Sequence, residues 1–336
     1  MKPKNLAIYA LAVITLLCLY TTTEASRSDA LFPVRVQGKW GYIDKTGKLD
    51  IQPQFVGAKP FYEGLAQVKV GDKWGYIDPN GKMIIDPQFE YNRPFSTGLA
   101  GIREEKGFGY INKRGKIVVR PFFANGTSFS DGYAAVGTPS CCGGKWIYID
   151  RKGLMIPNLF FLQGNKFSEG LAAVKLKGWG YIDTNGKYVI KSQFEAANDF
   201  SHGLASTAYR VGHNQPGKYG FIDKTGKWVI QPTFERAGTF SEGLARIRIN
   251  DLWGYINTAG DIVISPQFEN ANEFSDGLAP VKINGKWGYV NKAGKIVIEP
   301  NLDRVYSYSN GLALVQVDNQ FSYIDKTGKV VWQYED

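Results

Sequence analysis

The residue types that most often perform catalysis or bind metals are scarce in this chain of 336 residues, which has three cysteines and two histidines. His202 stands in a repeated surface turn, and His213 lies in an insertion without partners. No phosphate-binding loop, Gly-x-Ser-x-Gly, Ser-x-x-Lys or zinc-type cysteine spacing is present. We therefore expect a protein that is not an enzyme, uses no cofactor and holds no catalytic or structural metal.

Cys141 and Cys142 are adjacent in the sequence, and the third cysteine, Cys18, lies in the N-terminal apolar segment. In an oxidising compartment the adjacent pair could form a vicinal disulfide, bridge two chains or remain free. Adjacency alone does not decide among these three states. No redox-type Cys-x-x-Cys is present.

A repeated unit positions nearly all of the other residues. Nine aromatic anchors, 33 to 40 residues apart, mark it: Trp40, Trp74, Phe108, Trp146, Trp179, Tyr219, Trp253, Trp287 and Phe321. Seven anchors are followed by Gly, the exceptions being Ile147 and Ser322. Tyr or Phe always stands two residues after the anchor, Asp or Asn four residues after it, and Gly three residues later again. A Pro-x-Phe element and a Phe-Ser-x-Gly-Leu-Ala element follow in most copies.

The sequence of each unit predicts three short strands joined by tight turns. In the eighth copy they are residues 279–283, 286–291 and 296–298, rich in β-branched and aromatic residues. Asn284-Gly285 is a two-residue hairpin turn, and Asp-x-x-Gly fits a type I turn that ends in a left-handed Gly. We expect the following Pro to end the third strand, because it lacks the N–H that a ladder needs.

The units fill residues 31–333 nine times, so we predict one all-β repeat domain over residues 26–336. A 20-residue meander cannot bury its own apolar face, and neighbouring units must therefore stack. We expect an open, twisted, solenoid-like array of three-stranded meanders. The alternative is a closed β-propeller, but propellers usually have four strands in each blade and four to eight blades.

The string Gly-Lys-Trp-Gly-Tyr-Ile-Asp-x-x-Gly-Lys, followed by Pro-x-Phe and Phe-Ser-x-Gly-Leu-Ala, resembles the WG-repeat, or KWG-repeat, family. The resemblance covers essentially all of residues 31–333 and departs from the pattern at Phe108, Ile147, Tyr219 and Ser322. It implies tandem β repeats, mostly bacterial and often exported, with no general activity or catalytic residues to transfer. A fainter likeness is to choline- and glucan-binding cell-wall repeats.

Residues 1–25 have the three parts of a secretory signal peptide. Lys2 and Lys4 precede an apolar run, and Thr23 and Ala25 occupy the positions that a signal peptidase reads. The run is short for a membrane span, although retention as an N-terminal anchor is the alternative. We therefore expect export to the periplasm, the cell surface or the medium, with no membrane span once the signal is removed.

The repeated side chains have two interpretations each. The repeated aromatics could stack on sugars, but every unit needs aromatics for packing, so we expect most of them in the core. Trp228 and Trp332, which lie in the third strand of their units, are the expected exposed exceptions. The repeated Asp or Asn could ligate calcium, but it lacks a second acidic ligand and fits an Asx-type turn. Its nine positions are Asp44, Asp78, Asn112, Asp150, Asp183, Asp223, Asn257, Asn291 and Asp325.

Lysines flank these turns and would line one edge if the units stack in register. The edge comprises Lys45, Lys48, Lys113, Lys116, Lys224, Lys227, Lys292, Lys295, Lys326 and Lys329. It could bind an anionic partner, or it could only provide solubility and protect strand ends. We expect a non-enzymatic scaffold that binds a protein or other ligand at the cell envelope or outside the cell. The alternative is a module that binds a wall polymer or carbohydrate through its aromatics and lysines, and in neither case is nucleic acid the partner.

Overall fold

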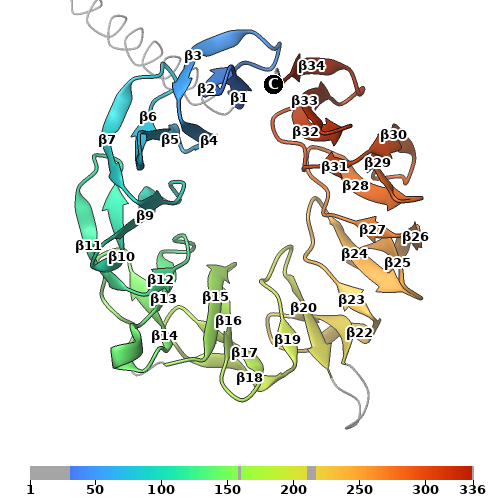
Figure 1. Ribbon diagram of the computed structural model, residues 1–336. Coiled ribbons are helices and arrows are strands. Elements are labelled where there is room, and N and C mark those ends of the chain that lie inside the picture. Colours follow the sequence, from blue (N-terminus) through green and yellow to red (C-terminus); the bar gives the residue numbers. More distant parts are fainter. Residues whose placement is uncertain (1–30, 158–159, 210–216, 335–336) are drawn as a thin grey trace, which may run out of the picture.

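The computed structural model describes residues 31–157, 160–209 and 217–334, which form nine small antiparallel sheets arranged in a ring (Figure 1). The predicted signal peptide and His213 lie outside the described residues. No helix in the described part of the chain is long and apolar enough to cross a membrane. The nine sheets correspond to the nine units that the sequence predicts.

The first three sheets contain the following strands: β1 Phe32–Val36, β2 Lys39–Ile43 and β3 Leu49–Phe55; β4 Gly57–Tyr62, β5 Leu65–Val70, β6 Lys73–Ile77 and β7 Met83–Phe89; β8 Tyr91–Asn92, β9 Leu99–Glu104, β10 Gly107–Asn112 and β11 Ile117–Phe123. The fourth to sixth sheets contain β12 Asn125–Gly126, β13 Tyr133–Gly137 and β14 Trp146–Asp150; β15 Gln163–Ser168, β16 Leu171–Lys175, β17 Trp179–Asp183 and β18 Tyr188–Phe194; β19 Ala196–Ala197, β20 Leu204–Tyr209, β21 Lys218–Asp223 and β22 Trp228–Phe234. The last three contain β23 Arg236–Ala237, β24 Leu244–Ile249, β25 Leu252–Asn257 and β26 Ile262–Phe268; β27 Asn270–Ala271, β28 Leu278–Ile283, β29 Lys286–Asn291 and β30 Ile296–Leu302; β31 Arg304–Val305, β32 Leu312–Val317, β33 Gln320–Asp325 and β34 Val330–Gln333. A 3₁₀ turn, η1, spans Ser140–Cys142.

Seven of the nine sheets have four strands, which corrects the prediction of three. The additional strand comes from the segment before the Phe-Ser-x-Gly element and lies nearest the centre of the ring, as β4 and β15 do in Figure 1. Eight sheets, including the three-stranded fourth sheet, have this inner strand, and in six of them it is only two residues long, for example Asn270–Ala271. A strand this short has no alternating pattern, so it cannot be predicted from the sequence.

The outermost strand also differs from its prediction, because it continues through the proline. β30 runs from Ile296 to Leu302 and includes Pro300. The register shifts twice, between Trp287 and Tyr289 and between Tyr289 and Val290, so the outer strand bends across the strand beside it. Proline is tolerated here because an outer strand has one edge without a ladder partner.

This bend leaves no room for a side chain on the residue that follows the anchor, which is why that residue is Gly. A Cβ atom at Gly75 would lie 2.5 Å from the carbonyl oxygen of Ile85 and 2.9 Å from the nitrogen of Pro87. The two exceptions lie where the bend is missing. Ile147 is in the fourth sheet, where β14 has only isolated bridges on its outer side, and Ser322 pairs directly with Gln333 near the end of the last strand.

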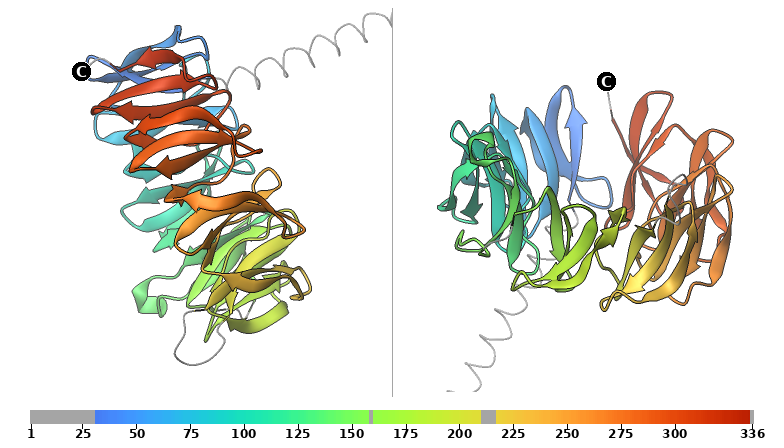
Figure 2. Two further views of the ribbon diagram at one scale, coloured as in Figure 1. Left: turned by 90° about the vertical axis from the view of Figure 1, so that its right-hand side faces the viewer. Right: turned by 90° about the horizontal axis from the view of Figure 1, so that it is seen from below.

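The array closes into a nine-bladed β-propeller, so the expectation of an open solenoid is wrong. The first and ninth sheets share a buried cluster that includes Phe32, Val34, Leu312 and Tyr323, and both lie at the same end of the side view in Figure 2. The sequence arguments against closure failed because the inner strand of eight of the nine sheets was not predicted. The count of nine also lies just beyond the usual range for propellers.

The core of the molecule lies between neighbouring sheets. In seven units the residue two positions after the anchor is a fully buried tyrosine, as Tyr42, Tyr181 and Tyr289 are, and its ring packs on the aromatic of the next Phe-Ser-x-Gly element. Its hydroxyl donates to a main-chain carbonyl 17 residues further on, at 2.8 Å from Tyr42 to Lys59. Burial raises the pKa of each of these three phenols far above the ordinary tyrosine value.

Candidate functional site

One side of the ring, the turn face, carries the Asp-x-x-Gly and Phe-Ser-x-Gly turns. All nine repeated Asp or Asn residues form Asx turns, each through an Oδ1 that accepts the main-chain N–H groups two and four residues on. The Gly of the turn has a positive φ, for example +86° at Gly226. The Asx-turn prediction is confirmed, because each of these side chains holds its turn together through hydrogen bonds to the main chain.

The Phe-Ser-x-Gly turns join each sheet to the next. Ser275 Oγ donates to the carbonyl oxygen of Tyr308 in the following sheet at 2.7 Å. An acidic residue at the x position accepts the N–H of the next Gly, as Asp276 does from Gly311 at 2.7 Å. His202 occupies this x position, where its Nδ1 lies 3.0 Å from Ser201 Oγ and its ring centre lies 6.4 Å from that of Phe240.

The ten lysines of the predicted basic edge are all exposed on the turn face. Three that directly follow the Asp or Asn form ion pairs with the x-position acid of the preceding sheet: Lys113 with Glu63, Lys224 with Glu169 and Lys292 with Glu242, at 3.0–3.3 Å. Those three positive charges are locally balanced. The edge is therefore less basic than the sequence alone suggests.

The opposite side of the ring, the hairpin face, carries the turn between the second and third strands of each sheet and the anchors beside it. Eight anchors are half-buried there: Trp40, Trp74, Trp146, Trp179, Tyr219, Trp253, Trp287 and Phe321. Phe108 is buried, with 2% of its surface exposed. Trp228 and Trp332, expected to be exposed, are half-buried, because Trp228 packs edge-on against Phe194 and Tyr209, and Trp332 packs in the cluster between the last and first sheets.

Cations lie over several anchor rings. Arg246 lies 4.9 Å from the centre of the Trp253 ring, Lys175 lies 5.9 Å from that of Trp179, and Arg236 lies 5.9 Å from that of Tyr219. The anchors and the lysine edge occupy opposite ends of the same strands. A central strand of about five residues separates them by ~16 Å, so they cannot contact the same sugar unit.

Cys141 and Cys142 lie in η1, in the long hairpin of the fourth sheet, and both are exposed. Their sulfur atoms are 3.5 Å apart and unbonded. Among the described residues, no three His, Cys, Asp or Glu side chains lie close enough together to hold a metal ion.

The repeat model described as the WG containing repeat matches seven segments, residues 40–74, 74–107, 108–138, 179–207, 219–253, 253–287 and 287–321, which together cover more than half of the chain. The chain belongs to the WG-repeat family. Its fourth unit, between residues 138 and 179, is not matched, in agreement with the irregular fourth sheet.

Solved structures with the same general fold are distant in sequence. A crystal structure described as that of the eukaryotic initiation factor superposes with a TM-score of 0.62 at 14% identity, covering 91% of this WG-repeat chain and 96% of the other. Hsv2 of Kluyvelomyces marxianus gives 0.43 at 10% identity, covering 68% and 88%. No protein of curated function matches the sequence. The first likeness supports the fold alone.

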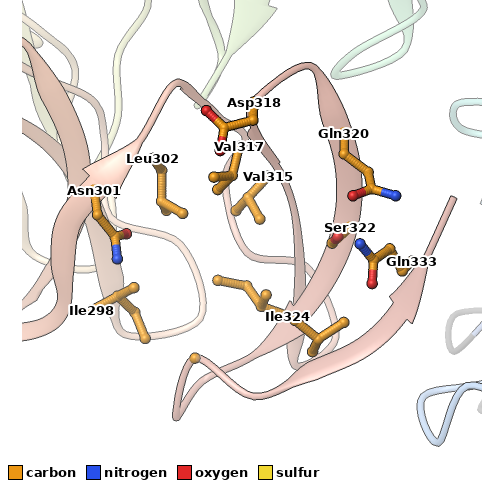
Figure 3. A pocket seen from close by; sticks show the side chains of 12 residues that line it. Ile298, Asn301, Leu302, Val315, Val317, Asp318, Gln320, Ser322, Ile324 and Gln333 are labelled. Carbon is orange, nitrogen blue, oxygen red and sulfur yellow. The ribbon is translucent and has the colours of Figure 1, made fainter.

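Several cavities interrupt the regular surface of the described part of the WG-repeat ring, three of which stand out. One of about 340 Å³ lies beside the last sheet and is lined by Ile298, Val315, Val317, Gln320 and Gln333 (Figure 3). A second, of about 660 Å³, lies on the fifth sheet, and a third, of about 700 Å³, lies where the first and last sheets meet. The sequence analysis predicted none of these three, and the third lies beside β1, which has no inner partner strand among the described residues.

Proposed function

We propose that this WG-repeat propeller is an exported, non-catalytic scaffold that binds a carbohydrate polymer along its hairpin face. The observation that carries the proposal is the series of half-buried anchors, eight of nine, at equivalent places around one face. An aromatic ring with one accessible side complements the apolar face of a pyranose, and a series of such rings suits a polymer that repeats. Many weak contacts would together give useful affinity.

The cations over the anchors indicate which polymers fit best. Lys175 and Arg236 lie beside anchor rings, whereas the charge of Arg246 is already paired with Glu273 at 3.0 Å. A polymer with carboxylate or phosphate substituents would meet both a ring and a positive charge at the same unit. An acidic envelope polysaccharide is therefore the preferred ligand class.

The experiment compares the two faces of the ring. Purified protein is pulled down on insoluble wall polysaccharides and tested on glycan arrays, with Trp179→Ala, Trp253→Ala and Trp287→Ala combined. We expect at least about a tenfold loss of binding, because stacking groups each contribute on the order of 1 kcal/mol. Lys227→Gln, Lys295→Gln and Lys329→Gln combined form the matched control on the turn face and should bind normally.

The opposite result would contradict the proposal. Binding that disappears in the lysine variant and in high salt, while the tryptophan variant binds normally, would assign the ligand to the turn face. Trp253→Phe keeps a ring and should retain most of the binding. A far-ultraviolet circular dichroism spectrum checks that each variant is folded.

Export is tested separately. If residues 1–25 are a cleaved signal, the protein recovered from the envelope or medium begins at Ser26. An intact Met1 on membrane-bound protein would instead indicate a retained anchor.

A protein partner is the second candidate, and the irregular fourth sheet favours it. The chain between the fourth and fifth sheets exposes Leu154, Phe160 and Leu162 at 65%, 51% and 50% of their surfaces. Leu162 and Leu176 also line the cavity on the fifth sheet. Several large exposed apolar side chains within one short segment often mark a protein interface.

Site-specific photocrosslinking tests this candidate in the native envelope. A photoreactive residue at position 162 should capture one defined protein, whereas the same residue at Val229, an exposed position on a regular outer strand, should not. Equal capture at both positions, or capture at neither, would leave the carbohydrate polymer as the proposed ligand.

A further inference from the structure

Among the described residues, the first sheet of the ring lacks the inner strand that the other eight sheets have. Its order is β1-β2-β3, so β1 forms the inner edge, and nothing in the described part of the chain pairs with that side. In the eighth sheet the corresponding edge is covered by β27, through Asn270 opposite Lys282 and Ala271 opposite Val281. The described residues therefore supply eight of the nine inner positions of the ring.

The eight inner segments share a pattern, which shows what chemistry the position accepts. A small, amide or valine residue lies in the strand and an aromatic follows three residues later: Ala58 and Phe61, Asn92 and Phe95, Gly126 and Phe129, Gly164 and Phe167, Ala197 and Phe200, Ala237 and Phe240, Ala271 and Phe274, Val305 and Tyr308. All eight aromatics are buried. Each packs on the Tyr or Phe two residues after the preceding anchor, with ring centres 4.8–5.0 Å apart.

Where the ninth sheet meets the first, the chain compensates only in part. Phe32 stands where the other units have Ala, and its ring lies 5.4 Å from Tyr323. Tyr323 and Tyr334 donate hydrogen bonds to the carbonyl oxygen of Pro33. A cavity of about 700 Å³ nevertheless remains, walled by Phe32, Tyr308, Tyr323 and Tyr334 among others.

The chain's own preceding residues are poorly suited to this place. Aligning Leu31 with Leu278 puts Glu24 where the eighth unit has Ala271 and Arg27 where it has Phe274. Both positions are buried in the eighth sheet, where Ala271 is 0% exposed. Burying unpaired charges there would be costly.

We propose that an extended segment of a partner protein adds to the inner edge of β1 and places a large apolar side chain in the cavity between the first and last sheets. This mode of recognition, in which main-chain hydrogen bonds give affinity and a pocket gives specificity, is general for exposed strand edges. The partner segment carries a small residue followed three positions later by an aromatic, as the eight internal segments do. The interaction is independent of the carbohydrate ligand proposed above.

The main-chain groups that would receive this segment can be named. In the eighth sheet Lys282 accepts a hydrogen bond from the N–H of Glu269, so its main-chain groups point to the inner side. Arg35 has the same register, opposite Trp40 as Lys282 is opposite Trp287. Its N–H and C=O therefore point to the vacant edge and away from β2.

The probe is a fluorescein-labelled peptide with the sequence of residues 269–277, which contains Ala271 and Phe274. Fluorescence anisotropy with the full chain, and with a chain that begins at Ser26, should show saturable binding. The same peptide with Phe274→Arg imitates the chain's own Arg27 and should bind at least about tenfold more weakly, because a guanidinium would enter an aromatic-walled cavity.

Two variants of the protein locate the site. Arg35→Pro removes the inward N–H without breaking the β1–β2 ladder and should abolish binding. Ser307→Trp, at the exposed rim of the cavity, should block binding, whereas Ser128→Trp, at the same repeat position where an inner segment is already present, should not. Circular dichroism confirms that all three variants are folded.

Several results would overturn the proposal. Absence of peptide binding, equal affinity of the Phe and Arg peptides, or equal loss in the Ser307 and Ser128 variants would each do so. If the chain beginning at Ser26 bound the peptide more than tenfold tighter than the full chain, the protein's own N-terminal residues would be the occupant instead of a partner.

Discussion

The hydroxyl of Tyr334 donates a 2.9 Å hydrogen bond to the carbonyl oxygen of Pro33, joining two residues that are 301 positions apart. Tyr334 follows the last strand, and Pro33 lies in the first. In the eighth sheet the equivalent carbonyl, that of Pro280, accepts instead from the N–H of Asn272, just after the inner strand. Side chains therefore close this ring, in place of a strand shared between its first and last sheets.

We expect Tyr334→Phe to lower the free energy of unfolding by about 1 kcal/mol, the usual net value of one hydrogen bond. Tyr334→Ala should cost about 3 kcal/mol, because the ring also contacts Trp40, Phe321 and Tyr323. Urea unfolding measures both. Tyr62→Phe, at an exposed tyrosine, is the control and should change stability by less than about 0.5 kcal/mol. No effect of Tyr334→Ala would mean that these contacts do not hold the ring closed.

The serines of the Phe-Ser-x-Gly turns allow a comparison between a joined and an unjoined pair of sheets. Ser275 donates to Tyr308 of the next sheet, whereas Ser309 has no such contact with a following sheet among the described residues. Ser275→Ala should therefore destabilise the protein by about 1 kcal/mol, and Ser309→Ala by much less. Thermal unfolding monitored by circular dichroism would show the difference. Equal losses would argue that the bond between sheets contributes nothing specific.

The Gly after the anchor should be intolerant of any side chain wherever the outer strand bends across it. Gly75→Ala would force its Cβ against the backbone of Ile85 and Pro87, and we expect a loss of about 3 kcal/mol or more. Ser322→Ala, at the matching position of the last sheet, should be nearly neutral, since a Cβ is already present there. Chemical denaturation of the two variants provides the test, and a stable Gly75→Ala protein would refute this explanation of the motif.

Much of the fold could be predicted because its signals are local. The Asx turns, the hairpins and the number of units each depend on a few neighbouring residues, such as Asp223 with Thr225 and Gly226. Closure of the ring depends on the contact between Tyr334 and Pro33, and no local sequence pattern predicts a contact between residues so far apart. The inner strand was not predicted because a strand of two residues, such as Asn270–Ala271, is too short to show an alternation of apolar and polar side chains.

The candidate sites could be predicted less well, because exposure is a property of packing. Trp287 and Tyr289 lie two residues apart on one strand, yet one is half-buried and the other is fully buried. The sequence could not show that Glu242 balances the charge of Lys292, since these residues are 50 positions apart. The cavity between the first and last sheets lies beside β1, which has no inner partner strand among the described residues, and sequence reasoning cannot find such a place before the ring itself is known.

The Asx turns predict a specific loss of stability in acid. A hydrogen bond from Thr225 lowers the pKa of Asp223 below its ordinary value of 3.8, and one from Thr327 does the same for Asp325. A lowered pKa in the folded state means that the carboxylate stabilises the fold fully above pH 4, and that this contribution is lost as the pH falls through the lowered value. Asp223→Asn with Asp325→Asn keeps the Oδ1 acceptor, as Asn291 does naturally, and removes the titration.

We therefore expect the free energy of unfolding of the double variant to fall less than that of the natural protein between pH 5 and about pH 2.5, measured by urea titration at each pH. Asn291→Asp combined with Ala293→Thr is the converse control, because it introduces a titrating carboxylate together with the Thr hydroxyl that lowers the pKa of Asp223 and Asp325, and it should increase the loss in acid. Parallel pH profiles for all three proteins would show that these turns do not bind their carboxylates more strongly in the folded state.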